Sequence, residues 1–118
     1  MEMKLKNYAY LGDAVWELFV REHTIAETQN SMDLHKMTTD RVNASFQARI
    51  LQEIEPELTE EELDLMRRGR NLSVPIARRS NQAEYRQATA FEVLIGWWYQ
   101  HNKERLGYFL KIFEEKIK

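Results

Sequence analysis

The chain of 118 residues contains no cysteine, only two prolines and only four glycines. Without cysteine it has no disulfide framework, no thiolate cluster for zinc and no thiol nucleophile, which fits a reducing cytosol. No stretch alternates apolar and polar residues as a half-buried strand requires. Uncharged runs are too short to cross a bilayer, and the N-terminus lacks the apolar segment of a signal peptide. We therefore expect a cytoplasmic protein that does not enter a membrane.

Apolar side chains make up 43% of the chain, which is enough for the core of one domain spanning residues 1–118. These side chains recur at three- and four-residue steps, and this spacing predicts an all-α fold. Thr59 and Glu62 form a predicted capping box at the start of one helix. The predicted helices run from Leu5 to about His23, from an N-cap at Ser31 to Pro56 with a break between Thr39 and Asn43, from Thr59 to Arg70, from Gln82 to His101, and from Glu104 to Lys118.

Two apolar runs carry acids with no basic residue inside the run. In residues 8–20 the only charged residues are Asp13 and Glu17, and in residues 88–99 the only one is Glu92. A carboxylate in apolar surroundings is costly unless it is paired or bound to a metal. Asp13 and Glu17 are four residues apart and share one helix face. Because carboxylate oxygens suit Mg2+ and Mn2+, we predict a metal site formed by Asp13 and Glu92.

Each of these acids stands near a glycine. Gly12 precedes Asp13, and Gly96 lies one turn after Glu92. A missing side chain allows another backbone or a phosphate to come close. Alternatively, both acids are satisfied structurally by buried amides or by bases from elsewhere in the chain. Glu17 could orient a water or a neighbouring side chain, or make a hydrogen bond in the core.

Charge is unevenly distributed although the net charge is only −2. Residues 53–64 contain seven acids and no base, whereas residues 67–86 contain six arginines and one acid. The planar guanidinium group suits bidentate contact with phosphate, so this segment predicts a basic edge that binds nucleic acid. Alternatively, these arginines pair with the acidic helix before them.

Several segments resemble the ribonuclease III family. YLGDAVWELFV (residues 10–20) resembles the family's metal-binding signature helix, and TAFEVLIGWWY (89–99) resembles its second acidic helix. DLHKMTTDRVNASFQA (33–48), RRGRN (67–71) and YRQATAFEVLIG (85–96) resemble motifs of the Mini-III branch, which has the catalytic domain without a domain for binding double-stranded RNA. The resemblance runs over essentially the whole chain, in the right order. It implies the helical fold of the ribonuclease III endonuclease domain.

The resemblance implies a Mg2+-dependent endoribonuclease that hydrolyses double-stranded RNA and leaves 5′-phosphate and 3′-hydroxyl ends, with Mn2+ as a possible substitute. The implied substrate is precursor 23S ribosomal RNA, matured at both ends, with a ribosomal protein as a possible assistant. Full ribonuclease III has further acids at the places of Ala9 and Thr89. The catalytic acids are thus reduced to Asp13 and Glu92, with Glu17 in support, and the RNA phosphate would help to recruit any second cation.

The resemblance also implies a two-fold homodimer, because one site cuts one strand. Tyr10, at the place of the family's aromatic plug, is the candidate interface anchor, with Leu11 and Trp16 beside it; alternatively Tyr10 is a core aromatic. We expect the catalytic domain itself to hold the RNA through phosphates and 2′-hydroxyls. The candidate RNA-binding residues are Lys36, Arg67, Arg68, Arg70, Asn71, Arg78, Arg79 and Arg86.

Two other functions stay open. The residues Ala9 and Thr89 would also fit a non-catalytic RNA-binding or ribosome-associated protein on the same fold, and the third possibility is a purely structural partner domain. The aromatic run of residues 97–99 could stack on bases, but consecutive side chains on a helix diverge, so at least two are expected in the core or the dimer interface. The three histidines lack metal-binding spacing and are expected to be surface or capping groups.

Overall fold

The computed structural model describes residues 3–72 and 82–117, and within these ranges the chain forms helices and no strand. The prediction of an all-α fold is confirmed, and the predicted helix from Gln82 to His101 has the bounds that the structure shows. The helices are α1 (Leu5–Ile25), α2 (Ser31–Val42), α3 (Ala44–Ile54), the 3-10 turn η1 (Glu55–Glu57), α4 (Glu60–Arg70), α5 (Gln82–His101) and α6 (Lys103–Lys116).

Local capping signals determine where α3 and α4 begin. The predicted capping box of α4 is present, because the Thr59 hydroxyl accepts from the Glu62 amide at 3.2 Å and the Glu62 carboxylate accepts from the Thr59 amide at 2.8 Å. Asn43 separates α2 from α3, and its Oδ1 accepts from the Phe46 amide at 2.9 Å. The break expected between Thr39 and Asn43 therefore falls at the last of these residues.

The start of α2 differs from the prediction. Ser31 is the first helical residue, and Asn30 is the N-cap. The Asn30 side chain accepts from the backbone amides of Met32 at 2.9 Å and Asp33 at 3.1 Å. Asparagine and serine cap helices equally well, so tertiary context decides which of two neighbouring residues does so.

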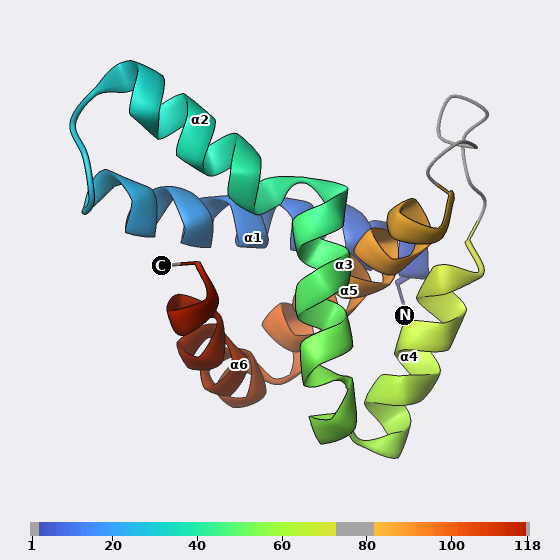
Figure 1. Ribbon diagram of the computed structural model, residues 1–118. Coiled ribbons are helices and arrows are strands. Elements are labelled where there is room, and N and C mark those ends of the chain that lie inside the picture. The colour runs from blue at the N-terminus through green and yellow to red at the C-terminus, as the bar shows by residue number, and fades with distance from the viewer. Residues whose placement is uncertain (1–2, 73–81, 118) are drawn as a thin grey trace.

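Helix α5 is the centre of the fold, with α1, α3 and α4 packed around it (Figure 1). It is buried on several sides because these helices approach it from different directions. Trp16 links α1 to this centre, because its ring lies 5.0 Å from the Phe91 ring of α5 and 5.5 Å from the Phe113 ring of α6, between centroids.

The backbones of α1 and α5 are in direct contact at two glycines. A Cβ atom on Gly12 would lie 1.8 Å from the Glu92 carbonyl oxygen, and one on Gly96 would lie 1.9 Å from the Tyr8 carbonyl oxygen. Neither helix could carry a side chain there without moving away from the other. The space expected beside each acid is thus filled by the backbone of the opposite helix.

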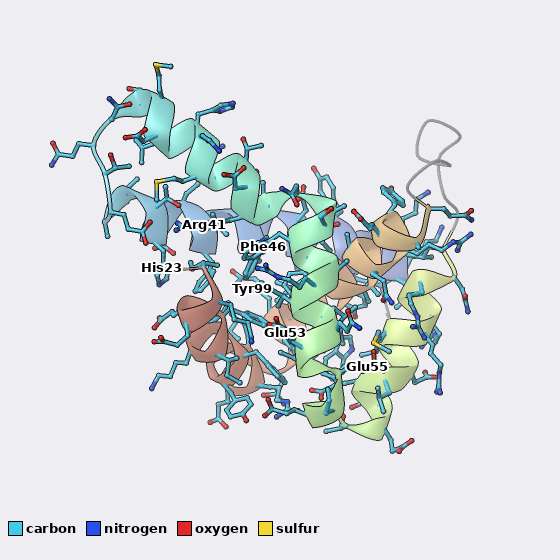
Figure 2. All side chains as sticks on the ribbon, viewed as in Figure 1. His23, Arg41, Phe46, Glu53, Glu55 and Tyr99 are labelled. Atoms are coloured by element: carbon cyan, nitrogen blue, oxygen red, sulfur yellow. The ribbon has the colours of Figure 1, made fainter. Side chains whose placement is uncertain are left out.

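Helix α2 lies along α1 at the upper left of Figure 1 and has no buried residue. Arg41, labelled in Figure 2, ties it to the end of α1 and to the turn that follows. Its Nη1 donates to Thr24 Oγ1 at 3.1 Å, and its Nη2 pairs with Glu27 at 2.9 Å. Among the helices that the structure describes, none has the length and apolar character needed to span a membrane.

Candidate functional site

Asp13 of α1 and Glu92 of α5 lie side by side where the two helices cross. Their carboxyl groups are close enough for a hydrogen bond between them when one carries a proton. The crossing explains this closeness, because Asp13 follows Gly12, and Gly12 touches the backbone of Glu92. The structure therefore brings together the two acids that the sequence singles out.

The pKa of Glu92 is strongly raised by its surroundings. Burial, followed by the hydrogen bond to Asp13 and the repulsion from its charge, raises the pKa of Glu92 to about 8. The amide of Gln47 acts in the opposite direction and favours the carboxylate. Two adjacent carboxyl groups, one of which keeps its proton at neutral pH, form a place where a cation can replace that proton.

The expectation that both acids are buried is only partly correct. Glu92 is half-buried, but Asp13 is exposed. The core face of α1 passes through Gly12 and Trp16, and a step of one residue turns the side chain by about 100°, which puts Asp13 at the edge of that face. This position leaves the Asp13 carboxylate open to a ligand from solvent.

Glu17 forms an ion pair with a base that lies outside the apolar run. Its Oε2 lies 3.0 Å from Nη2 of Arg21, one turn further along α1. Arg21 comes immediately after the apolar run of residues 8–20, so the absence of a base inside the run does not leave Glu17 without a partner. Glu17 is half-buried, and the ion pair accounts for its charge.

The oxygen atoms at the crossing fit a divalent cation held by few protein ligands. Among the described residues there is no group of three or more His, Cys, Asp or Glu side chains that could hold a metal. Thr89, at one place where full ribonuclease III has an acid, donates its hydroxyl to the Tyr85 carbonyl of its own helix at 2.9 Å. Mg2+ commonly binds through one or two carboxylates and completes its shell with water and substrate phosphate, so the Asp13–Glu92 pair suits it.

Gln47 of α3 is a residue at this crossing that the sequence did not single out. It is only 2% exposed, and its amide lies beside the Glu92 carboxyl group. The sequence feature that could have predicted Gln47 is a polar residue on the apolar face of this helix, which otherwise carries Ile50, Leu51 and Ile54.

Two arginines of α4 are partly neutralised by an acid of the same helix. Nη atoms of Arg67 and Arg68 lie 3.5 and 3.7 Å from the Asp64 carboxylate, so these two arginines do pair with the acidic helix. Both are more than half exposed, and such pairs are weak enough for a phosphate to replace the carboxylate. Arg70 is half-buried, and Asn71 is exposed at the C-cap of α4.

The other predicted RNA-binding residues have different surroundings. Arg86 holds the end of α4, because its Nη1 donates to the Arg70 carbonyl at 2.6 Å. Lys36 is exposed on α2 and pairs with Asp40 at 3.0 Å. Arg78 and Arg79 lie outside the described residues.

These basic groups lie on two flanks of the acid pair and not around it. Gly69 of α4 packs against Ala90 of α5, and Ala90 and Glu92 point about 160° apart on the helix. Figure 1 shows α2 and α4 at opposite sides of the molecule, with α3 between them.

The predicted interface residues differ in exposure. Tyr10 is 84% exposed, which excludes the alternative of a core aromatic, and Leu11 is half-buried. Trp16 was predicted wrongly, because its ring is fully buried and its Nε1 donates to the Arg41 carbonyl at 2.9 Å. Leu18, which is 61% exposed, was missed although it stands eight residues after Tyr10 on the same helix face.

The aromatic run and the histidines are largely structural. Trp98 is buried and stacks on Phe109, whereas Tyr99 is 39% exposed, so the run does not form one stacking surface. His101 bonds the Tyr8 hydroxyl at 2.7 Å, and His23 faces α6 (Figure 2), where it lies 3.4 Å from Glu114.

Comparison with known proteins shows which family the chain belongs to. Residues 6–103 match the family described as the ribonuclease III domain. The chain is 43% identical over 113 residues to the Mini-ribonuclease 3 of Gloeobacter violaceus, which covers 96% of this chain and 84% of that protein. It is 39% identical over 106 residues to the Mini-ribonuclease 3 of Synechocystis sp., with 90% and 74% covered.

A solved structure shares the fold. The crystal structure of protein FN1578 from Fusobacterium nucleatum superposes with a TM-score of 0.86 at 32% sequence identity, over 98% of this chain and 94% of the other. The helical fold and these matches define the class as the ribonuclease III domain, a class of RNA endonucleases. Within that class, the chain belongs to the Mini-ribonuclease 3 family.

Proposed function

We propose that this protein is a Mg2+-dependent endoribonuclease that cleaves double-stranded RNA at the Asp13–Glu92 pair. The observation that supports this function best is the adjacency of the two carboxyl groups. Burial, then the hydrogen bond between them and their mutual repulsion, raise the pKa of Glu92 to about 8, and the uncharged amide of Gln47 opposes this. A structural acid would be expected to have a base as its partner.

Asp13 and Glu92 would hold the cation, and each has a different part in doing so. Glu92 lies on α5 and is half-buried, whereas Asp13 is exposed to solvent. A bound Mg2+ or Mn2+ ion lowers the pKa of water and offsets negative charge on a reacting phosphate. Glu17 supports the site by holding Arg21 on the same face of α1 as Asp13, where the guanidinium can meet a phosphate.

The reaction that fits this site is hydrolysis of the bond between phosphorus and the 3′ oxygen. Water adds its oxygen to phosphorus, the 3′ oxygen leaves with a proton, and the products carry a 5′-phosphate and a 3′-hydroxyl. No side-chain nucleophile takes part in this scheme.

The substrate class is supported by the family and by the charge on the two flanks. Duplex RNA is held through phosphates and 2′-hydroxyls over successive grooves, so contacts from separate flanks suit it. Within the Mini-ribonuclease 3 family the substrate that we propose is precursor 23S ribosomal RNA in the cytoplasm, with assistance from a ribosomal protein. The proposed contacts are Lys36, Arg67, Arg68, Arg70, Asn71, Arg78, Arg79 and Arg86.

We also propose that the protein acts as a homodimer through the exposed face of α1. Tyr10, Ala14 and Leu18 recur every four residues and form an exposed stripe on this helix, with Leu11 at its edge. Two copies joined across a two-fold axis would present two acid pairs to one duplex, one for each strand.

Substitution of the two acids tests the proposed activity. Asp13→Asn and Glu92→Gln keep the side-chain shape and remove the charge that binds the cation, so each should lower kcat on a duplex RNA by about 100-fold or more, with little change in KM. Glu22→Gln is the matched control, because Glu22 is an exposed acid on the same helix. Initial rates with Mg2+ and with EDTA give these values.

Near-parental rates for either acid variant would overturn the catalytic role of the pair. A wild-type protein that binds duplex RNA but leaves it intact in Mg2+ would instead favour the non-catalytic RNA-binding function.

A further inference from the structure

Gln47 occupies a position where a polar side chain needs an explanation. It lies on the buried face of α3 and is 2% exposed, next to positions that hold Ile50 and Leu51. An amide placed in the core is unfavourable unless its donors and acceptor are hydrogen-bonded. Its Nε2 atom is buried and forms no hydrogen bond of normal geometry with any residue that the structure describes.

The unpaired amide lies at the same junction as the acid pair. Asp13 comes from α1, Glu92 from α5 and Gln47 from α3, and the amide is near enough to the Glu92 carboxyl group to favour its charged form. A glutamine NH2 group can only donate, and an ionised carboxylate can only accept. The amide therefore fits Glu92 in the charged form that a cation requires.

We infer that Gln47 is a positioning residue for Glu92, with its NH2 group donating to one carboxylate oxygen and so directing the other oxygen toward Asp13. This inference rests on the proposed function, because it assumes that Asp13 and Glu92 bind a cation. A hydrogen bond of this kind fixes the orientation of a ligating carboxylate without adding charge or titrating. The competing explanation is that Gln47 only fills space between α3 and α5.

Replacing Gln47 by methionine separates these explanations. Gln47→Met keeps the length of the side chain and removes the amide, and Gln52→Met makes the same change at an exposed position of the same helix. Loss of a hydrogen bond that orients a metal-binding side chain typically weakens metal binding by about 10-fold or more. We expect Gln47→Met to raise the Kd for Mn2+, measured by calorimetry without RNA, by about 10-fold, and Gln52→Met to leave it unchanged.

Two further readouts distinguish positioning from packing. The midpoint temperature of Gln47→Met in EDTA should not fall below that of the wild type, because methionine keeps the volume of the side chain and removes a polar group from a buried position. In the cleavage assay at fixed Mg2+, kcat should fall while KM for the duplex stays the same. A space-filling role would leave both the Kd and kcat unchanged.

A measurement on the wild-type protein decides the question even where the variant does not fold. The side-chain NH2 resonances of Gln47 should shift when Mg2+ is added, and those of Gln52 should not. An unchanged Gln47 resonance, or a Kd for Gln47→Met within twofold of the wild type, overturns the inference while the proposed function stands. A wild-type protein that binds neither Mn2+ nor Mg2+ overturns both.

Discussion

At neutral pH, Glu92 largely keeps a proton that an exposed glutamate would have lost, since burial and Asp13 raise its pKa from 4.5 to about 8. Glu62 is an informative contrast. Burial acts to raise the pKa of Glu62 as well, but hydrogen bonds from Arg105, the Thr59 amide and Trp98 outweigh burial and lower it. Glu62 is therefore a satisfied structural acid, whereas Glu92 is a strained one, and strained acids in accessible places are candidates for function.

The raised pKa of Glu92 determines in which direction the free energy of unfolding changes with pH. Between pH 4.5 and about 8 the folded protein holds a proton on Glu92 that the unfolded chain has released. The free energy of unfolding of the cation-free protein must therefore fall as pH rises through this window, and this contribution levels off above pH 8.

Glu92→Gln should remove that loss of stability. In EDTA at pH 9 the variant should be more stable than the wild type by an amount on the order of 2 kcal/mol, whereas the difference should shrink near pH 5. Urea unfolding followed by circular dichroism at both pH values measures this. Added Mg2+ should stabilise only the wild type at pH 9, because ligand binding shifts the equilibrium toward the folded state. A difference that is the same at both pH values would contradict the raised pKa.

At the scale of helices, the α1–α5 crossing determines whether the two acids meet. Gly12→Ala and Gly96→Ala each introduce a Cβ that would lie 1.8 or 1.9 Å from a carbonyl oxygen of the other helix. Because the helices must move apart, we expect each change to lower the free energy of unfolding by about 3 kcal/mol and to weaken Mn2+ binding.

Gly107 is the matched control, because a Cβ there meets nothing within 4 Å. Gly107→Ala on α6 should stabilise the protein by about 0.5–1 kcal/mol through the higher helix propensity of alanine. Urea unfolding compares all three variants, and a Gly12→Ala protein as stable as the wild type would show that the helices need not touch.

At the scale of the whole molecule, the exposed stripe on α1 predicts association of two copies. Tyr10→Glu places a charge on a side chain that is 84% exposed in one copy and that would be buried in a dimer. We expect wild-type protein at micromolar concentration to have twice the mass of one chain by light scattering, and Tyr10→Glu to have the mass of one. Met32→Glu is the control, because Met32 is 82% exposed but lies on α2.

A wild-type protein that is monomeric at these concentrations would oppose the paired-site arrangement. A dimer that survives Tyr10→Glu would place the interface on another surface.

Much of the fold could be predicted from the sequence because its signals are local. The three- and four-residue spacing of apolar side chains, the Thr59–Glu62 capping box and the break at Asn43 act within one or two helical turns. The same holds for the choice of Asp13 and Glu92, which stand out by their apolar neighbours. The Glu17–Arg21 pair is equally local, but it was not predicted, because Arg21 lies one residue beyond the apolar run.

The sequence by itself determined the helices, the family motifs and the residue types that can bind a cation. Only the tertiary structure decided that Asp13 is exposed, that Trp16 is buried, that Glu62 meets Arg105 43 residues away, and that Gln47 of a third helix lies beside Glu92. These outcomes depend on how helices from distant parts of the chain pack together, and for α1 and α5 the close approach occurs at Gly12 and Gly96.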